Sequence, residues 1–156
     1  MRGIVIGCDN AAVGLKNEIV SLLKKQDIQV EDVGCFSEND PILYPEVAET
    51  VCKKIQDSGF EKKGILICGT GLGMSISANK CKGIYATVCH DTYSAQRSIL
   101  SNNANVLCLG ERVIGYELAK VIVNEWIHLE FIDGRSTEKV QAIHAIEDKN
   151  FVKAIV

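Results

Sequence analysis

The chain has 156 residues, of which 47% are hydrophobic and 24% charged, and its formal net charge is −3. This length suits one domain with a well-filled core, and the slightly acidic balance gives no electrostatic reason to expect nucleic acid as a partner. No apolar run reaches the roughly 20 residues that cross a bilayer, and residues 1–7 are too short for a signal-peptide core. We therefore expect a single cytoplasmic domain over residues 1–156, with no membrane partner.

The cysteines show no metal-binding or disulfide pattern. There are seven, at positions 8, 35, 52, 68, 81, 89 and 108, without a C-x-x-C pair. Their odd number and scatter favour reduced thiols over a disulfide framework or a zinc site. We expect no metal and no cofactor, and we interpret every cysteine except Cys68 as a small buried hydrophobic side chain.

Short apolar runs alternate with helical patterns along the whole chain. The pattern predicts strands over residues 2–7, 29–33, 64–68, 84–89 and 106–109, and helices from 11 to about 26, 47 to 58, 93 to 100, 114 to 126 and about 136 to 151. A further helix follows the glycines after residue 68. Residues 34–45 hold both prolines and Tyr44, and we expect them to form an irregular, functional loop.

Strands and helices in this alternation predict a parallel sheet covered on both faces, a Rossmann-like three-layer α/β/α sandwich. We expect the strand order 2-1-3-4-5, numbered along the chain. Ligands of such sheets bind outside the carboxyl ends of the strands, where the strand order reverses. Asp9 follows the first strand and Cys68 ends the third, so both are predicted to face one crevice.

The stretch Gly64–Ser75 is the most informative motif. A buried strand ends at Cys68, and Gly69, Gly71 and Gly73 lead into a helix. Amides at such a turn favour an anion and lower the pKa of a nearby thiol, although the glycines alone would also be explained by a tight turn. A dinucleotide-binding fingerprint with Asp91 is disfavoured, because it belongs in the first βα turn and a short chain leaves little room for a substrate domain.

Histidines and basic residues near irregular chain complete the candidates. His90 follows a strand, where it is either an acid or base or a hydrogen-bonded structural residue, whereas His128 and His144 are interpreted as structural. Arg112 lies in irregular chain, and Arg135 and Lys139 are one helical turn apart. These three basic groups together could bind a phosphate, although each alone is more often a solvated side chain.

Several motifs together resemble one known family, the type B ribose-5-phosphate isomerases and the related galactose-6-phosphate isomerase subunits. The similarity covers nearly the whole chain and rests on Gly7-Cys8-Asp9, Tyr44-Pro45, residues 64–76 with Ala78-Asn79-Lys80, Tyr93-Ser94-Ala95, Asn102-Asn103-Ala104-Asn105-Val106, Leu109-Gly110-Glu111-Arg112 and Asp133-Gly134-Arg135.

This resemblance implies a metal-free aldose–ketose isomerisation of a sugar phosphate through an enediolate. It implies a homodimer, often paired into tetramers, in which the neighbouring subunit completes each active site and the C-terminal helix packs on the partner. Cys68 would shuttle the proton between C1 and C2, and Thr70 with the amides of Gly69–Gly73 would stabilise the oxyanion. The family positions that contact the sugar match Asp9, Tyr44 and Asn102, and those that hold the phosphate match Arg112 and Arg135.

Three positions depart from the family pattern. Asn10 and Ser101 stand where these enzymes usually have histidines, the second of which is thought to open the furanose ring, and Lys139 stands in place of an arginine. An isomerase for a different pentose, hexose or tetrose phosphate would explain these departures, and His90 could alternatively open the ring. The other hypothesis is a catalytically weak homologue that binds a sugar phosphate as a sensor or partner subunit.

Overall fold

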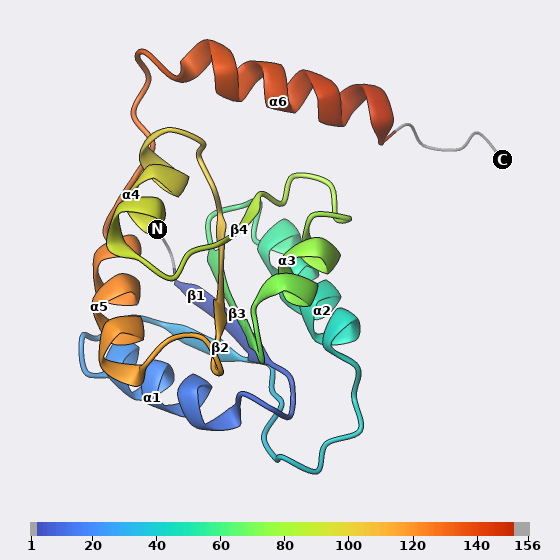
Figure 1. Ribbon diagram of the computed structural model, residues 1–156. Helices are drawn as coiled ribbons and strands as arrows, with labels where there is room; N and C mark the ends of the chain where they lie inside the picture. Colours follow the sequence, from blue (N-terminus) through green and yellow to red (C-terminus); the bar gives the residue numbers. More distant parts are fainter. Residues whose placement is uncertain (1–2, 152–156) are drawn as a thin grey trace, which may run out of the picture.

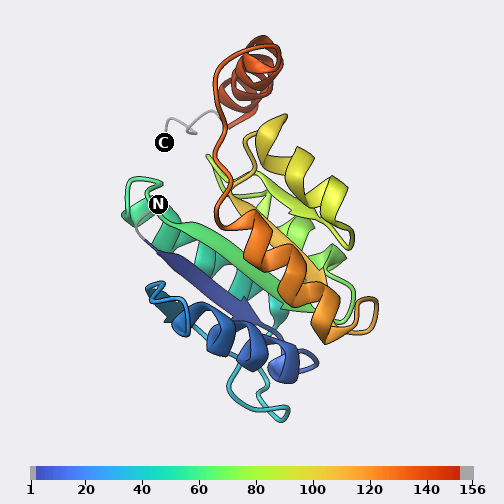
Figure 2. The same ribbon diagram turned by 90° about the vertical axis from the view of Figure 1, so that its left-hand side faces the viewer.

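The computed structural model describes residues 3–151 and shows a parallel five-stranded sheet between two layers of helices (Figure 1). Helices α2 and α3 cover one face, and α1, α4 and α5 cover the other, as the turned view in Figure 2 also shows. The elements are β1 Ile4–Cys8, α1 Val13–Lys24, β2 Val30–Asp32, α2 Tyr44–Asp57, β3 Lys63–Cys68, α3 Leu72–Ala78, β4 Ala86–Val88, α4 Thr92–Leu100, β5 Val106–Gly110, α5 Tyr116–Trp126 and α6 Thr137–Asn150. The predicted three-layer sandwich is confirmed.

The strand order is β2-β1-β3-β5-β4, so the predicted order 2-1-3-4-5 is wrong in its last two strands. All five residues of β5 are buried, whereas Thr87 and Val88 of the three-residue strand β4 are partly exposed. The longer apolar strand therefore takes the inner position, and the short strand takes the edge. Because of this exchange, Gly110 at the end of β5 is the register partner of Cys68 at the end of β3.

Helix α2 begins earlier than the sequence pattern predicted. Tyr44 is its first residue and Pro45 lies in its first turn, where a proline does not interrupt the helical hydrogen bonds. The irregular loop therefore ends at Leu43, and Tyr44 is held by a helix instead of a loop. The other helices and strands differ from the predicted ranges by only a few residues at their ends.

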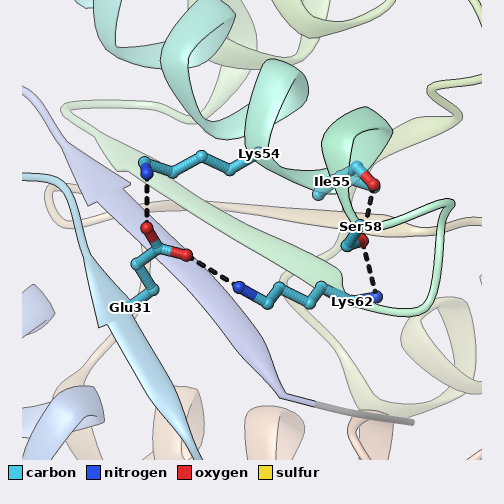
Figure 3. A network of polar contacts seen from close by, with 5 residues as sticks. All are labelled: Glu31, Lys54, Ile55, Ser58 and Lys62. Atoms are coloured by element: carbon cyan, nitrogen blue, oxygen red, sulfur yellow. Dashed lines mark hydrogen bonds and ion pairs between the residues drawn. The ribbon is translucent and has the colours of Figure 1, made fainter.

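A cluster of charged groups closes the edge of the sheet at β2 (Figure 3). The Glu31 carboxylate accepts hydrogen bonds from Lys54 on α2 and, at 2.8 Å, from Lys62 before β3, and these bonds hold its pKa below the usual value. Ser58 Oγ donates to the Ile55 carbonyl at 2.6 Å and accepts from the Lys62 amide at 3.2 Å. The end of α2 and the entry to β3 are thus tied to the edge strand.

Helix α6 lies beyond the amino ends of the strands, opposite the loop of residues 34–43 (Figure 1). The sequence pattern put Val140, Ile143 and Ile146 on one side of this helix. Val140 is buried, but Ile143 is 39% and Ile146 63% exposed, so these two isoleucines do not pack on the chain's own core. Within residues 3–151, no helix is long and apolar enough to cross a membrane.

Candidate active site

The carboxyl ends of β1, β3 and β5 meet at one edge of the sheet. Cys8 is the register partner of Ile67, and the amide of the next residue, Asp9, donates to the Ile67 carbonyl at 3.1 Å. Beyond Gly110, the Glu111 amide donates to the Cys68 carbonyl at 2.9 Å. Asp9 and Cys68 therefore end neighbouring strands at the reversal of the strand order, as the sequence predicted.

The turn after β3 directs an amide at the Cys68 thiol. Gly71 has φ 80°, a left-handed conformation that favours glycine, and its N–H donates to Cys68 Sγ at 3.1 Å. A hydrogen bond from an amide stabilises a thiolate more than a thiol. Burial raises the pKa of the Cys8 thiol, on the neighbouring strand, to about 12. Cys68 itself is only 5% exposed, and all seven cysteines are free.

Two glycines permit close approaches that shape this turn. A Cβ on Gly110 would lie 2.6 Å from the backbone carbon of Thr70, so β5 can approach the turn only without a side chain there. A Cβ on Gly73 would lie 2.7 Å from the ring of Tyr44, which therefore packs directly on the start of α3. Thr70 is exposed, and its Oγ1 accepts from the Leu72 amide at 3.4 Å.

A carboxylate and a guanidinium lie beside the thiol. Asp9 Oδ1 accepts from the Ala11 amide at 3.0 Å; burial raises the pKa of the Asp9 carboxyl, and the positive charge of Arg112 opposes that rise. A Cβ on Gly69 would lie 3.4 Å from Arg112 Nη1, so the guanidinium covers this glycine. Asn10, next to Asp9, is exposed. This edge thus combines a thiol, a carboxylate, a glycine turn and a cation.

His90 uses one ring nitrogen within the fold. Its Nε2 accepts from the Gly110 amide at 2.8 Å, and burial lowers its pKa. The ring is therefore neutral at physiological pH, with its proton on Nδ1. The other two histidines lie elsewhere: His128 follows α5 and is exposed, and His144 stacks on Tyr85.

Glu111 and Tyr116 also support the site, although the sequence patterns predict no role for either. Glu111 accepts from Tyr116 Oη at 2.6 Å and from the Leu15 amide at 3.4 Å, so it joins the starts of α1 and α5 behind Asp9 and Arg112. Its carboxylate raises the pKa of Tyr116 to about 12. In the sequence, a hint of this role is the position of Glu111, an acidic residue between Gly110, which ends a buried strand, and Arg112.

Four predicted site residues lie at the opposite edge of the sheet. Ser101 and Asn102 precede β5, whose five residues span about 16 Å at ~3.3 Å per residue before reaching the level of Cys68. Arg135 precedes α6 and Lys139 lies in its first turn, beyond the same amino edge. One chain therefore does not bring these four residues to Asp9, Asn10, Tyr44, Cys68, Gly69, Thr70, Gly71, Gly73, His90 and Arg112.

The described residues contain no group of three or more His, Cys, Asp or Glu side chains that could hold a metal ion. A thiol beside an amide turn, with an arginine at the switch point of a parallel sheet, is typical of an enzyme site for a small anionic substrate. The fold and the site thus define an α/β enzyme of this class.

Known proteins identify the class further. Residues 4–143 match the family model described as Ribose/Galactose Isomerase. The chain is 50% identical to the D-erythrulose-4-phosphate isomerase of Pectobacterium atrosepticum over 92% of this chain and 93% of that one. It is 45% identical to the ribose-5-phosphate isomerase B of Escherichia coli over 96% and 99% of the two chains. The solved ribose-5-phosphate isomerase B of Clostridium thermocellum superposes with a TM-score of 0.89, at 43% identity and 94% and 98% coverage.

The chain belongs to the ribose/galactose isomerase family and resembles its type B ribose-5-phosphate isomerases throughout. It is an enzyme of the sugar-phosphate isomerase class. The family named from the sequence motifs is thus confirmed, and the sensor hypothesis gains no support.

Proposed function

We propose that this enzyme interconverts D-erythrulose 4-phosphate and D-erythrose 4-phosphate. The observation that carries this choice is Ser101, which stands where the family usually has the ring-opening histidine. The C4 oxygen of a tetrose 4-phosphate is esterified, so no hydroxyl can close a five-membered ring, and the substrate needs no acid to open it. Asn10 supports the same choice, because it replaces a second imidazole. The 50% identity to the Pectobacterium enzyme agrees with it.

In the proposed reaction, the Cys68 thiolate removes a proton from C1 of the ketose and returns it to C2. Between these steps, the substrate is an enediolate, and a hydroxyl proton moves from O1 to O2, so no electron acceptor is needed. The Gly71 hydrogen bond to Cys68 Sγ supports the thiolate at the start of the reaction. The hydroxyl of Thr70 and the amides of Gly69–Gly73 stabilise the negative oxygen of the enediolate.

Arg112, Arg135 and Lys139 bind the phosphate, and Asp9, Tyr44 and Asn102 contact the sugar. Because Ser101, Asn102, Arg135 and Lys139 lie at the other edge of the sheet, we infer that a second copy of the chain contributes them, with α6 packed on its partner. The exposed Ile143 and Ile146 of α6 support this assembly, since an uncovered apolar pair on a helix is typical of an interface.

Replacing Ser101 tests the choice of substrate. Ser101→His combined with Asn10→His should increase kcat/KM for ribose 5-phosphate, because the variant regains a titratable group for ring opening. The same variant should gain nothing on D-erythrulose 4-phosphate, which has no ring to open. Equal gains on both substrates, or no gain on ribose 5-phosphate, would contradict the explanation.

Mixing two impaired variants tests the shared site, at a substrate concentration well below the wild-type KM, where a raised KM lowers the measured rate. Cys68→Ala and Arg135→Ala subunits are unfolded, mixed in equal amounts and refolded. If each site takes Cys68 from one copy and Arg135 from the other, random pairing should restore about a quarter of wild-type activity, because half of the dimers have one intact site. A mixture that stays as inactive as its components would refute the shared site.

A further inference from the structure

Helix α6 is fixed to the body of its own chain near its C-terminal end. Glu147 Oε1 accepts from the Gly83 amide at 2.7 Å, and Oε2 accepts from Tyr85 Oη at 2.8 Å. One turn earlier, the His144 ring stacks on Tyr85 with centroids 5.1 Å apart and an interplanar angle of 23°. We call Gly83, Tyr85, His144 and Glu147 the α6 cluster.

The two hydrogen bonds of this cluster to Glu147 are stronger than hydrogen bonds between neutral groups. Both go to one carboxylate, and hydrogen bonds to an ionised acceptor are shorter and stronger than those between neutral groups. Burial and the neighbouring Glu147 raise the pKa of Tyr85, so the phenol keeps the proton that it donates. Asp148 on the same helix forms an ion pair with Lys82, which precedes Gly83, but this pair is open to solvent, where such pairs contribute little.

The same segment is also tied to the loop that carries Ser101 and Asn102. Asn105 Oδ1 accepts from the Tyr85 amide at 2.8 Å, and Asn105 Nδ2 donates to the Gly83 carbonyl at 2.7 Å. Residues 83–85 are therefore held between Asn105 on one side and Glu147 on the other. Through them, α6 has a fixed place relative to the 101–105 loop.

The residues at the start of α6 depend on this attachment. Lys139 and Glu147 are eight residues apart, about 12 Å along a helix axis at 1.5 Å per residue. The chain between α5 and α6 is irregular, and its Ile132 is 80% exposed. Beyond this connection, the hydrogen bonds and ion pairs that join α6 to the rest of residues 3–151 come from the α6 cluster and the weak Lys82–Asp148 pair, and Val140 is buried.

We propose that Tyr85 and Glu147 are positioning residues, which hold α6 so that Arg135 and Lys139 meet the substrate's phosphate. This inference rests on the proposed function, in which those two side chains bind the phosphate. Neither Tyr85 nor Glu147 touches the substrate. A small displacement of a binding group weakens binding considerably, so loss of the cluster should reduce affinity for the phosphate before it affects the proton transfer.

The test compares Tyr85→Phe, Glu147→Gln and the double variant in the assembled enzyme, with D-erythrulose 4-phosphate and ribulose 5-phosphate as substrates. Each single variant should raise KM roughly tenfold and leave kcat within about twofold. The double variant should show less than the product of the two single effects, because both changes weaken the hydrogen bond between Tyr85 and Glu147. Asp148→Asn, which removes only the exposed pair with Lys82, is the matched control on the same helix and should leave both constants unchanged.

Arg135→Ala separates the two proposals. If Arg135→Ala raises KM and Tyr85→Phe does not, the positioning role is refuted while the proposed phosphate site stands. If Arg135→Ala leaves KM unchanged, the phosphate site itself fails, and the positioning role falls with it. A Tyr85→Phe variant that loses kcat or melting temperature at unchanged KM, or whose KM depends on enzyme concentration, would show a role in stability or assembly and would also refute the inference.

Discussion

The Gly71 amide donates a hydrogen bond to Cys68 Sγ over 3.1 Å, and this contact links the glycine turn to the proposed base. A glycine at φ 80° is needed to direct that amide inward. The conformation of the turn therefore fixes the position of the amide relative to the thiol.

Replacing the thiol should stop the proton transfer. Cys68→Ala and Cys68→Ser should lower kcat by about 10²- to 10⁴-fold, the usual range for loss of a general base, because neither side chain is a thiolate. The measurement is exchange of solvent deuterium into C1 and C2 of the substrate. Cys81→Ala, which removes a partly exposed thiol from another region, is the matched control and should keep wild-type exchange. Undiminished exchange in Cys68→Ala would exclude the proposed role.

Gly110→Ala should damage both stability and activity. Its Cβ would lie 2.6 Å from the Thr70 backbone, which cannot rotate away as a side chain can. We expect a loss of about 1–3 kcal/mol in the free energy of unfolding, as for other overpacked sites, with a clear fall in kcat. Gly115→Ala is the control, because a Cβ there meets no atom within 4 Å. Equal effects of the two changes in urea unfolding would contradict the packing argument.

Asp9→Asn should make the protein more stable at neutral pH and less active. Burial raises the pKa of Asp9 above 3.8, so the unfolded chain ionises more readily than the folded one as pH rises. The free energy of unfolding of wild type therefore decreases as pH rises from the unfolded-state pKa to the folded-state pKa of Asp9. Asp9→Asn cannot ionise and so avoids this loss, while its side chain keeps an acceptor for the Ala11 amide. The gain should appear in urea unfolding above about pH 4 and be absent at lower pH.

Asp91→Asn provides a control of opposite sign for this prediction. The backbone and side chain of Ser94 hydrogen-bond to Asp91 and lower its pKa, so this carboxylate stabilises the folded state above its ordinary pKa of 3.8. The Asp91→Asn variant should be less stable than wild type at neutral pH, and the difference should vanish in acid. If Asp9→Asn is also less stable than wild type at pH 7, the ionised Asp9 carboxylate does not destabilise the fold and the prediction is wrong.

His90 should make the fold sensitive to mild acid. Burial lowers its pKa below 6.5, so its contribution to stability is complete above that pH and is lost as pH falls through the folded-state pKa. His90→Gln keeps an acceptor for the Gly110 amide but cannot be protonated. The stability advantage of wild type over this variant, measured by urea unfolding, should shrink between pH 7.5 and 5. A constant difference would contradict the assignment of a partly buried, neutral ring.

The sequence predicted the sandwich and the neighbouring ends of β1 and β3, because buried strands and helical faces have local periodic patterns. The order of β4 and β5 was missed, since it depends on which strand fits the inner position, a property of the assembled sheet. Pro45 predicts a break and hence a loop at Tyr44, yet a proline is tolerated in the first helical turn, where the structure has it. The roles of Gly110, Glu111 and Glu147 depend on contacts between distant segments, which no local pattern contains.

The proposed substrate is tested most directly by one comparison of specificity constants. Purified enzyme is assayed with D-erythrulose 4-phosphate, ribulose 5-phosphate and a ketohexose 6-phosphate under identical conditions. The proposal predicts that kcat/KM is highest for the four-carbon substrate, by about tenfold or more, which corresponds to ~1.4 kcal/mol of transition-state stabilisation. A kcat/KM for the five- or six-carbon ketose phosphate that equals or exceeds this value would contradict the proposal.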